Sequence, residues 1–268
     1  MFAYVGVTAD RWRPRTRREW LTVAVGGLLL IAAYHAFLFA GEARPGVTSA
    51  AAAVVVSLSP VITTGFGRFV LPDDRLTPLG VLGLCCGLVA SSFSSSPRPS
   101  TRGDLSVLLD SNALGSLLVL CATASFALGS TLTERLDPDL PPATVEAWSM
   151  LLGALLMNAT SVALGEPQRV PLAPDPLAAL GYLSVVASAL GFLLYFSLLD
   201  RLGSVEVNLV SYVAPIVAAV VGWWLLGETL DATTAAGFLV VFAGFCLLKR
   251  RALHRELRRF VDDGARAD

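Results

Sequence analysis

Polar side chains with helical spacing interrupt the apolar runs of this sequence and are its first candidates for binding chemistry. Asn208, Ser211, Tyr212 and Pro215 are spaced i, i+3, i+4 and i+7, so they share one face of a helix. In a lipid-spanning helix, such a face turns toward the interior of the bundle, where a polar side chain is a candidate for substrate contact. The spacing therefore predicts a site that binds a solute through hydrogen bonds.

The larger polar side chains are the strongest of these candidates. Tyrosine, asparagine and histidine need a polar partner inside a membrane bundle, whereas serine and glycine also allow helices to pack closely. A histidine in mid-span, His35, is compatible with a proton relay or with an interior residue held by a hydrogen bond. The predicted substrate-binding residues are Tyr34, His35, Tyr195, Asn208, Ser211 and Tyr212.

The composition excludes a soluble globular domain. Apolar residues make up 54% of the chain and charged residues 15%, against about 25% charged residues in a typical soluble domain. The basic clusters flank apolar runs, which argues against nucleic-acid binding. All four cysteines lie inside apolar runs and the two histidines are far apart, so the sequence predicts no metal site, no cofactor and no catalytic residue.

Eight apolar stretches approach the length of about 20 residues that a helix needs to cross a bilayer. Backbone groups must be satisfied internally in lipid, so these stretches are predicted to be helices. The predicted fold class is therefore an all-α integral membrane protein with about eight transmembrane helices. The stretches are residues 20–41, 47–71, 76–95, 112–134, 142–165, 176–200, 204–227 and 232–250.

The second and seventh stretches are internally similar. Aligning Pro60 with Pro215 brings Gly67 onto Gly222. The two stretches are five helices apart, and because five is odd the copies enter the membrane from opposite sides. Such an inverted repeat is typical of secondary transporters, whose substrate site lies near the midplane between the halves. Each proline removes a helix hydrogen bond, so the pair is predicted to form hinges or purely structural kinks.

The repeat also determines how the N-terminal stretch is interpreted, which reads MFAYVGVTADRWRPRTRREW. The fourth and fifth helices need two partners before the first, so MFAYVGV is interpreted as the stub of a second helix whose remainder, with the first helix, is absent. Arginines cluster between Arg11 and Arg18 and again in the tail KRRALHRELRR. Positive residues mark the cytoplasmic side, so both termini are predicted to be cytoplasmic in a multi-pass protein of the cell membrane.

Residues 195–251, YFSLLDRLGSVEVNLVSYVAPIVAAVVGWWLLGETLDATTAAGFLVVFAGFCLLKRR, resemble the C-terminal half of an EamA-like domain of the drug/metabolite transporter superfamily. Residues 20–90 resemble the latter part of the first repeat of such proteins. The resemblance implies a ten-helix fold of two five-helix inverted repeats, of which this chain lacks the first helix and most of the second. It also assigns hinge or structural roles to Pro60, Gly67, Pro215, Gly222, Gly227 and Glu228, with Pro72-Asp73-Asp74 replacing the usual Gly-Glu of the first repeat.

The predicted organisation is a truncated first repeat (residues 1–95), a serine- and proline-rich linker (96–111), a second repeat (112–251) and a cytoplasmic tail (252–268). The predicted function is a secondary transporter, not an enzyme, for a small organic metabolite or drug-like solute. Its expected partners are that solute, a proton or counter-solute, membrane lipid and a second copy in a homodimer. The alternatives are an integral-membrane enzyme acting on lipid-linked substrates and a membrane fragment that does not transport.

Overall fold

The computed structural model describes residues 1–44, 47–70, 111–168 and 173–227, with residues 232, 235, 236, 238, 239 and 243. Over these residues the chain is helical and contains no strand, which confirms the all-α fold class. Within the described part of the chain, six helices are long and apolar enough to cross a membrane: Arg17–Glu42, Ser49–Val70, Leu114–Leu136, Pro142–Ala163, Pro174–Leu202 and Ser204–Leu225. They coincide with six predicted spans. The predicted span 76–95, most of 232–250, the linker up to residue 110, Glu228 and the tail lie outside the described residues.

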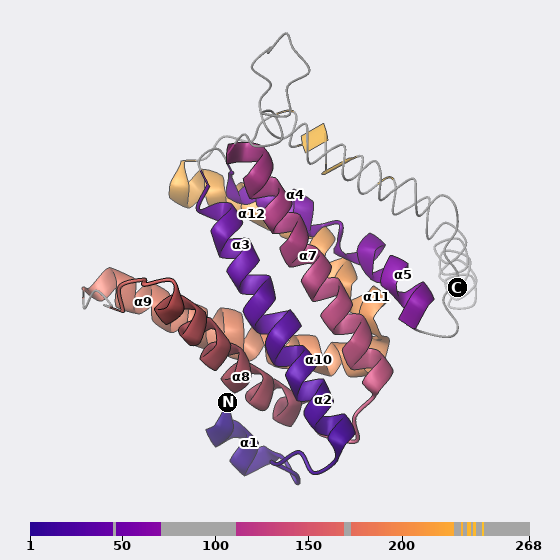
Figure 1. Cartoon of the computed structure of the whole chain (residues 1–268). Helices are drawn as coiled ribbons and strands as arrows, with labels where there is room; N and C mark the ends of the chain where they lie inside the picture. Colours follow the sequence, from indigo (N-terminus) through magenta and orange to yellow (C-terminus); the bar gives the residue numbers. More distant parts are fainter. Residues whose placement is uncertain are drawn as a thin grey trace, which may run out of the picture.

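The N-terminal part of the chain forms a short helix and one long span. Helix α1 (Phe2–Thr8) is followed by a loop and then by α2 (Arg17–Val25), the π-helix η1 (Gly26–Ala33) and α3 (Tyr34–Glu42), which together run the length of the bundle (Figure 1). Thr16 caps α2 in a reciprocal pair with Glu19, which satisfies two of the N–H groups left free at a helix start. This capping box therefore fixes where α2 begins.

The next spans are packed around α7. Helices α4 (Ser49–Val56) and α5 (Ser59–Val70) form the second span, and α7 (Ser111–Leu136) and α8 (Pro142–Ala163) form the third and fourth. Helix α7 contacts α3, η1, α4 and α5, whereas α8 packs on α2 and η1. Gly153 of α8 lies so close to η1 that a Cβ atom there would be 2.4 Å from a methyl carbon of Ile31. Small residues of this kind let helices approach closely in lipid.

The C-terminal part of the described chain forms two further spans. The fifth contains α9 (Pro174–Tyr182), the π-helix η3 (Leu183–Leu190) and α10 (Gly191–Leu202). The sixth contains α11 (Ser204–Val207), the 3₁₀-helix η4 (Asn208–Tyr212), α12 (Ala214–Val221) and the π-helix η5 (Gly222–Leu226). The sixth span crosses the bundle so that α11 lies near the end of α7 and α12 packs on α4.

The two repeat prolines lie at matched breaks in their spans. Pro60 is the second residue of α5, and Pro215 is the second residue of α12. In both spans the carbonyl two residues before the proline, on Leu58 or Val213, accepts two backbone N–H groups at 3.0–3.1 Å. Proline is favoured in the first turn of a helix because no hydrogen-bond partner is lost there. In the structure, each predicted kink therefore lies where a new helix begins after a break in the span. The hinge role of these prolines stays a prediction.

Candidate functional site

The side-chain amide of Asn208 is the centre of a buried hydrogen-bond network. Its Nδ2 donates to Thr63 Oγ1 at 2.8 Å and to Ser130 Oγ at 3.1 Å, and Tyr195 donates its hydroxyl to Oδ1 at 3.0 Å. Ser130 uses its own hydrogen on the Ala127 carbonyl, so its oxygen can only accept from Asn208. The orientation of the amide is therefore determined, and the network joins η4 to α5, α7 and α10.

The position of Asn208 depends on how its span begins. The backbone N–H of Ser204, the first residue of α11, donates to Glu134 Oε2 at 2.7 Å. A carboxylate near the start of a helix satisfies a free N–H group and opposes the positive end of the helix dipole. Glu134, at the end of α7, therefore sets the level at which the sixth span enters the bundle beside Ser130 and Thr63.

A cavity of about 380 Å³ lies beside this network. This volume falls in the range of about 300–1,000 Å³ that is usual for small-molecule sites. Its walls are largely hydrocarbon, with hydroxyl and amide groups at intervals and no Asp, Glu, Lys, Arg or His side chain among the lining residues. The lining residues are Tyr34, Val56, Ser59, Thr123, Phe126, Tyr195, Asn208, Val210, Ser211, Val213, Ala214 and Val217.

Three aromatic rings form one wall of the cavity. The ring of Phe126 lies 4.9 Å from the ring of Tyr34 and 4.9 Å from the ring of Tyr195, between centroids. Distances of this size are typical of favourable aromatic pairs. The wall comes from three spans, α3, α7 and α10, and its rings are tilted against each other by 53° and 57°. It gives a bound solute an apolar aromatic surface beside the polar groups of Asn208 and Ser211.

Four of the six predicted substrate-binding residues line this cavity, namely Tyr34, Tyr195, Asn208 and Ser211. The structure brings them together from α3, α10 and η4. That these four residues contact a solute stays a prediction. Ser211 also donates its hydroxyl to the Asn208 carbonyl at 2.7 Å, so it can accept a hydrogen bond from a solute without losing this contact.

The structure places the other two predicted residues outside the cavity lining. His35 Nδ1 donates to the Ile31 carbonyl at 2.7 Å, and its ring contacts Tyr34, Phe39 and Phe192. A carbonyl only accepts, so the hydrogen is on Nδ1 and the residue matches the description of a hydrogen-bonded interior histidine. Tyr212 is buried in an apolar cluster with Leu58, Ile62 and Ala127.

Helix α7 contributes to the site, although none of its residues is among those predicted from the sequence. Thr123 and Phe126 line the cavity, and Ser130 completes the Asn208 network. These residues are spaced i, i+3 and i+7, so they share one helix face. The same spacing rule that selected Asn208 would have found them, had it been applied to the stretch 122–136.

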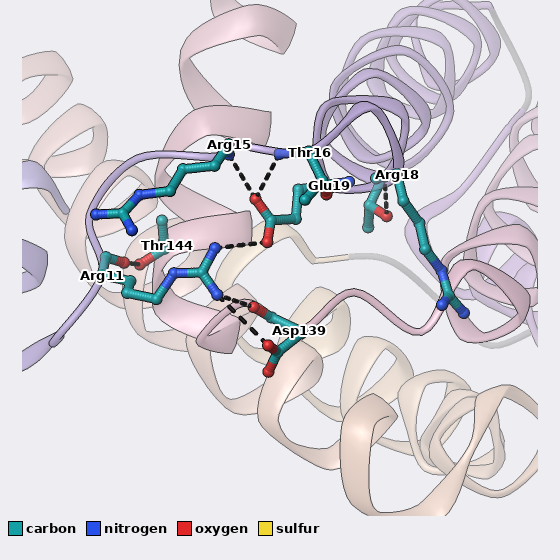
Figure 2. Close-up of polar contacts among 8 residues, drawn as sticks. Arg11, Arg15, Thr16, Arg18, Glu19, Asp139 and Thr144 are labelled. Carbon is teal, nitrogen blue, oxygen red and sulfur yellow. Dashed lines mark hydrogen bonds and ion pairs between the residues drawn. The ribbon is translucent and has the colours of Figure 1, made fainter.

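A second polar cluster lies at the end of the bundle where α2 and α8 begin. Figure 2 shows the guanidinium of Arg11 between the side chain of Glu19 and the turn that contains Asp139. Arg11 donates to Glu19 Oε1 at 2.6 Å and to the Asp139 carbonyl at 2.6 Å, and lies 3.6 Å from Asp139 Oδ2. The other oxygen of Glu19 accepts the backbone N–H groups of Arg15 and Thr16.

Further contacts attach the same loop, residues 9–16, to α8, and attach the start of α2 to the end of α7. Thr144 Oγ1 donates to the Arg11 carbonyl at 2.7 Å, and Trp148 Nε1 donates to the Trp12 carbonyl at 2.8 Å. Arg18, at the start of α2, donates to the Leu136 carbonyl at the end of α7. We call residues 9–16 together with these contacts the N-terminal latch. It closes this end of the bundle over the first turns of α8.

The described helices form a multi-pass bundle of apolar spans, several of which line a cavity of the size of a small solute. This arrangement is typical of membrane transport proteins. The family model of the EamA-like transporter family matches residues 1–96 and 113–250, and the chain belongs to this family. It is a membrane transporter of the drug/metabolite type.

Several relatives are similar over most of the chain. An uncharacterized inner membrane transporter of Escherichia coli K12, YedA, is 30% identical over 80% of this chain and 66% of its own length. An uncharacterized transporter of Archaeoglobus fulgidus is 24% identical over 85% of this chain and 76% of its own length. A protein of known crystal structure has the same fold, with a TM-score of 0.63 and 20% identity over 93% of this chain and 83% of that one.

Proposed function

We propose that the protein is a secondary transporter that carries a small organic solute without net charge, and that the cavity beside Asn208 is its binding site. Alternating access between the two inverted halves would expose this cavity to each side of the membrane in turn. The arginine clusters of the sequence support a cytoplasmic position for the N-terminal latch. The observation that carries the proposal is the cavity itself, since its walls come from both predicted repeats and carry hydrogen-bonding groups without a charge.

The distribution of the lining residues supports transport between two halves. Tyr34, Val56 and Ser59 belong to the predicted first repeat, whereas the remaining lining residues belong to the second. A site shared in this way changes shape when one half moves against the other. The paired breaks at Pro60 and Pro215 are candidates for the places where such a movement begins.

The chemistry of the walls supports a solute without net charge. Removing an ion from water carries a large free-energy cost unless a partner of opposite charge is present. The described lining residues include no ionised side chain, so they offer no such partner. They also include neither a carboxylate nor a histidine for acid–base chemistry, so the cavity does not support an enzyme acting on lipid-linked substrates.

A panel of solutes tests the proposal. The protein in lipid nanodiscs is screened by thermal shift against uncharged, zwitterionic, cationic and anionic metabolites, and each solute that stabilises it is then followed by counterflow in proteoliposomes. We expect stabilising solutes among the uncharged and zwitterionic groups only. Stabilisation and counterflow by multiply charged anions or cations alone would contradict the proposal.

A matched pair of tyrosine variants tests the location of the site. Tyr195→Phe removes one hydroxyl from the cavity and from the Asn208 network, whereas Tyr182→Phe removes an exposed hydroxyl outside it. Loss of one hydrogen bond of about 1 kcal/mol weakens binding by about fivefold. We expect this loss in Tyr195→Phe and wild-type affinity in Tyr182→Phe. Equal affinities in the two variants would place the solute elsewhere.

A further inference from the structure

The basic run from Arg11 to Arg18 contains arginines of two kinds. Arg11 is held by Glu19 and Asp139, and Arg18 donates to the Leu136 carbonyl. The other side chains of the run are exposed and form no hydrogen bond or ion pair with the described residues. They are Arg13, Arg15 and Arg17. The fold therefore uses part of the run internally and leaves the rest available at the surface.

The nearby carboxylates do not balance these free charges. Glu19 is buried, and its oxygens accept hydrogen bonds from Arg11 and from backbone N–H groups. Asp139 lies beside Arg11. Asp10 is exposed and forms no ion pair within the described part of the chain. This part of the surface therefore carries an excess of positive charge, which attracts anions.

The free arginines lie where a membrane span begins. Arg17 is the first residue of the span Arg17–Glu42. Trp12 and Trp20 flank the arginines along the chain, and both indoles are exposed. Tryptophan is enriched at the level of the lipid headgroups, where its ring meets hydrocarbon on one side and water on the other. The flanking indoles therefore indicate that the arginines lie at headgroup level.

The start of the fourth span contributes to the same aromatic cluster. The ring of Trp148 in α8 lies 5.4 Å from the ring of Trp20 in α2 and 5.3 Å from the ring of Phe2 in α1, between centroids. Its Nε1 donates to the Trp12 carbonyl at 2.8 Å. Aromatic groups from three helices thus gather at this end of the bundle, which supports the assignment of the headgroup level.

The backbone that carries the arginines is fixed by the contacts of the N-terminal latch. Thr16 and Glu19 form the reciprocal cap of α2. Thr144 and Trp148 hold the carbonyls of two consecutive residues of the loop. A surface whose backbone is already ordered loses less conformational entropy when it binds a partner.

The side chains of the free arginines extend from this fixed loop. Figure 2 shows Arg15 extending away from Glu19. The guanidinium of Arg13 lies over the ring of Trp12, 3.9 Å from its centroid. A guanidinium that stacks on an aromatic ring keeps its N–H groups available at its edge, where it can bind phosphate oxygens in pairs.

Other exposed arginines at this end of the bundle have different surroundings. Arg135 follows Glu134 at the end of α7, and Arg201 follows Asp200 at the end of α10. Glu134, Asp200 and Arg201 line one surface pocket. The positive charges are interspersed with carboxylates there, so the unbalanced positive charge belongs to the loop before α2.

We propose that this loop binds the phosphate groups of anionic phospholipids in the leaflet at this end of the bundle. We call the surface the basic rim, and it consists of Trp12, Arg13, Arg15, Arg17 and Trp20. Basic residues beside a span attract anionic lipids. Phosphatidylcholine carries a cation beside its phosphate and is therefore expected to bind less well. Lipid binding does not require transport, so failure to find a transported solute would leave the basic rim unaffected.

A matched pair of double variants tests the basic rim. Phosphatidylglycerol and phosphatidylcholine with the same acyl chains are titrated into the protein in detergent micelles, and bound lipid is measured by native mass spectrometry. An arginine near an anionic surface strengthens binding by about fivefold. We expect Arg15→Gln with Arg17→Gln to raise the dissociation constant for phosphatidylglycerol by roughly 20-fold.

The control removes the same charge from the same end of the bundle. Arg135→Gln with Arg201→Gln is expected to keep the parent affinity for phosphatidylglycerol. Equal losses in the two double variants would show that the general charge of this end attracts the lipid, and would overturn the proposal. Equal affinity of the parent protein for phosphatidylglycerol and phosphatidylcholine would also overturn it.

A quenching measurement tests the location without changing the basic rim. Replacing Trp223 and Trp224 by phenylalanine leaves Trp12, Trp20 and Trp148 as the tryptophans of the chain. The protein is placed in nanodiscs of equal amounts of the two lipids, one of which is brominated at a time. We expect stronger quenching by brominated phosphatidylglycerol. Equal quenching by the two lipids is the result expected if a water-soluble anion occupies the surface, and it would overturn the proposal.

Discussion

The Asn208 network and the N-terminal latch are both polar clusters that join distant parts of the chain, but they differ in charge and in exposure. The network consists of neutral side chains. The Asn208 amide is buried, its nitrogen donates to Thr63 and its oxygen accepts from Tyr195.

The latch contains the charged groups Arg11, Glu19 and Asp139 together with hydrogen bonds from Thr144 and Trp148 to its backbone. The side chain of Asp139 is fully exposed and that of Arg11 is 28% exposed, whereas that of Glu19 is 3% exposed.

This difference predicts two mechanical roles. Buried hydrogen bonds between neutral groups are costly to leave unmade, so the network holds one arrangement of α5, α7, α10 and η4. The ion pair of Arg11 with the exposed Asp139 lies near water, where ion pairs are weak and depend on salt. We therefore expect the latch to loosen before the bundle unfolds. The centre is expected to be rigid, and the latched end is expected to be the part that moves.

The largest expected effect is at the centre. Asn208→Ala leaves Tyr195, Thr63 and Ser130 without their shared partner, and unmade buried hydrogen bonds cost about 1–3 kcal/mol each. We expect the free energy of unfolding in detergent micelles to fall by about 3 kcal/mol. Asn158→Ala, at an exposed position of α8, is the matched control and should change it by less than about 0.5 kcal/mol. Equal stability of the two variants would mean that the network is not structural.

A smaller effect is expected at the latch. Glu19→Gln weakens the charge-assisted bond from Arg11 and the reciprocal cap of α2, at a cost of about 1–2 kcal/mol. Because the latch is local, we expect faster amide hydrogen exchange in residues 9–19 and little change around Asn208. The control is Glu166→Gln, which changes an exposed carboxylate outside the latch. Faster exchange throughout the bundle would show that the two regions are not independent.

The smallest effect is expected from salt. At 1 M salt the screening length falls to about 3 Å, which weakens the pairing of Arg11 with Asp139 and Glu19 more than it weakens neutral hydrogen bonds. We expect hydrogen exchange to increase up to a few-fold in the latch and to stay constant in η4. An equal response in the two regions would remove the distinction between a charged end and a neutral centre.

The positions of Ser211 and Tyr212 show how far helical spacing can predict a site. An α-helix places Asn208, Ser211 and Tyr212 on one face, and the sequence alone predicts that all three contact the solute. The structure has a 3₁₀-helix over Asn208–Tyr212. With three residues per turn, Ser211 lies directly above Asn208, and Tyr212 is rotated by about a third of a turn. Ser211 therefore lines the cavity, whereas Tyr212 packs against Leu58 and Ile62.

The latch shows a different limit. The sequence contains a dense basic run from Arg11 to Arg18, which predicts only the orientation of the chain in the membrane. It contains no signal that Arg11 meets Asp139, which is 128 residues away. The reciprocal cap of Thr16 and Glu19 lies within four residues and was visible as the pattern T-x-x-E, which is a helix-start signature.

The sequence by itself determined the membrane class, the six spans that the structure describes and the matched proline positions, because hydropathy and proline geometry act within a single span. The tertiary structure decided which polar faces meet. Asn208 and Thr63 are 145 residues apart. Their contact depends on where the bond to Glu134 fixes the start of the sixth span, and on the 3₁₀-helix that contains Asn208. These are properties of packed helices, and no local pattern of residues encodes them.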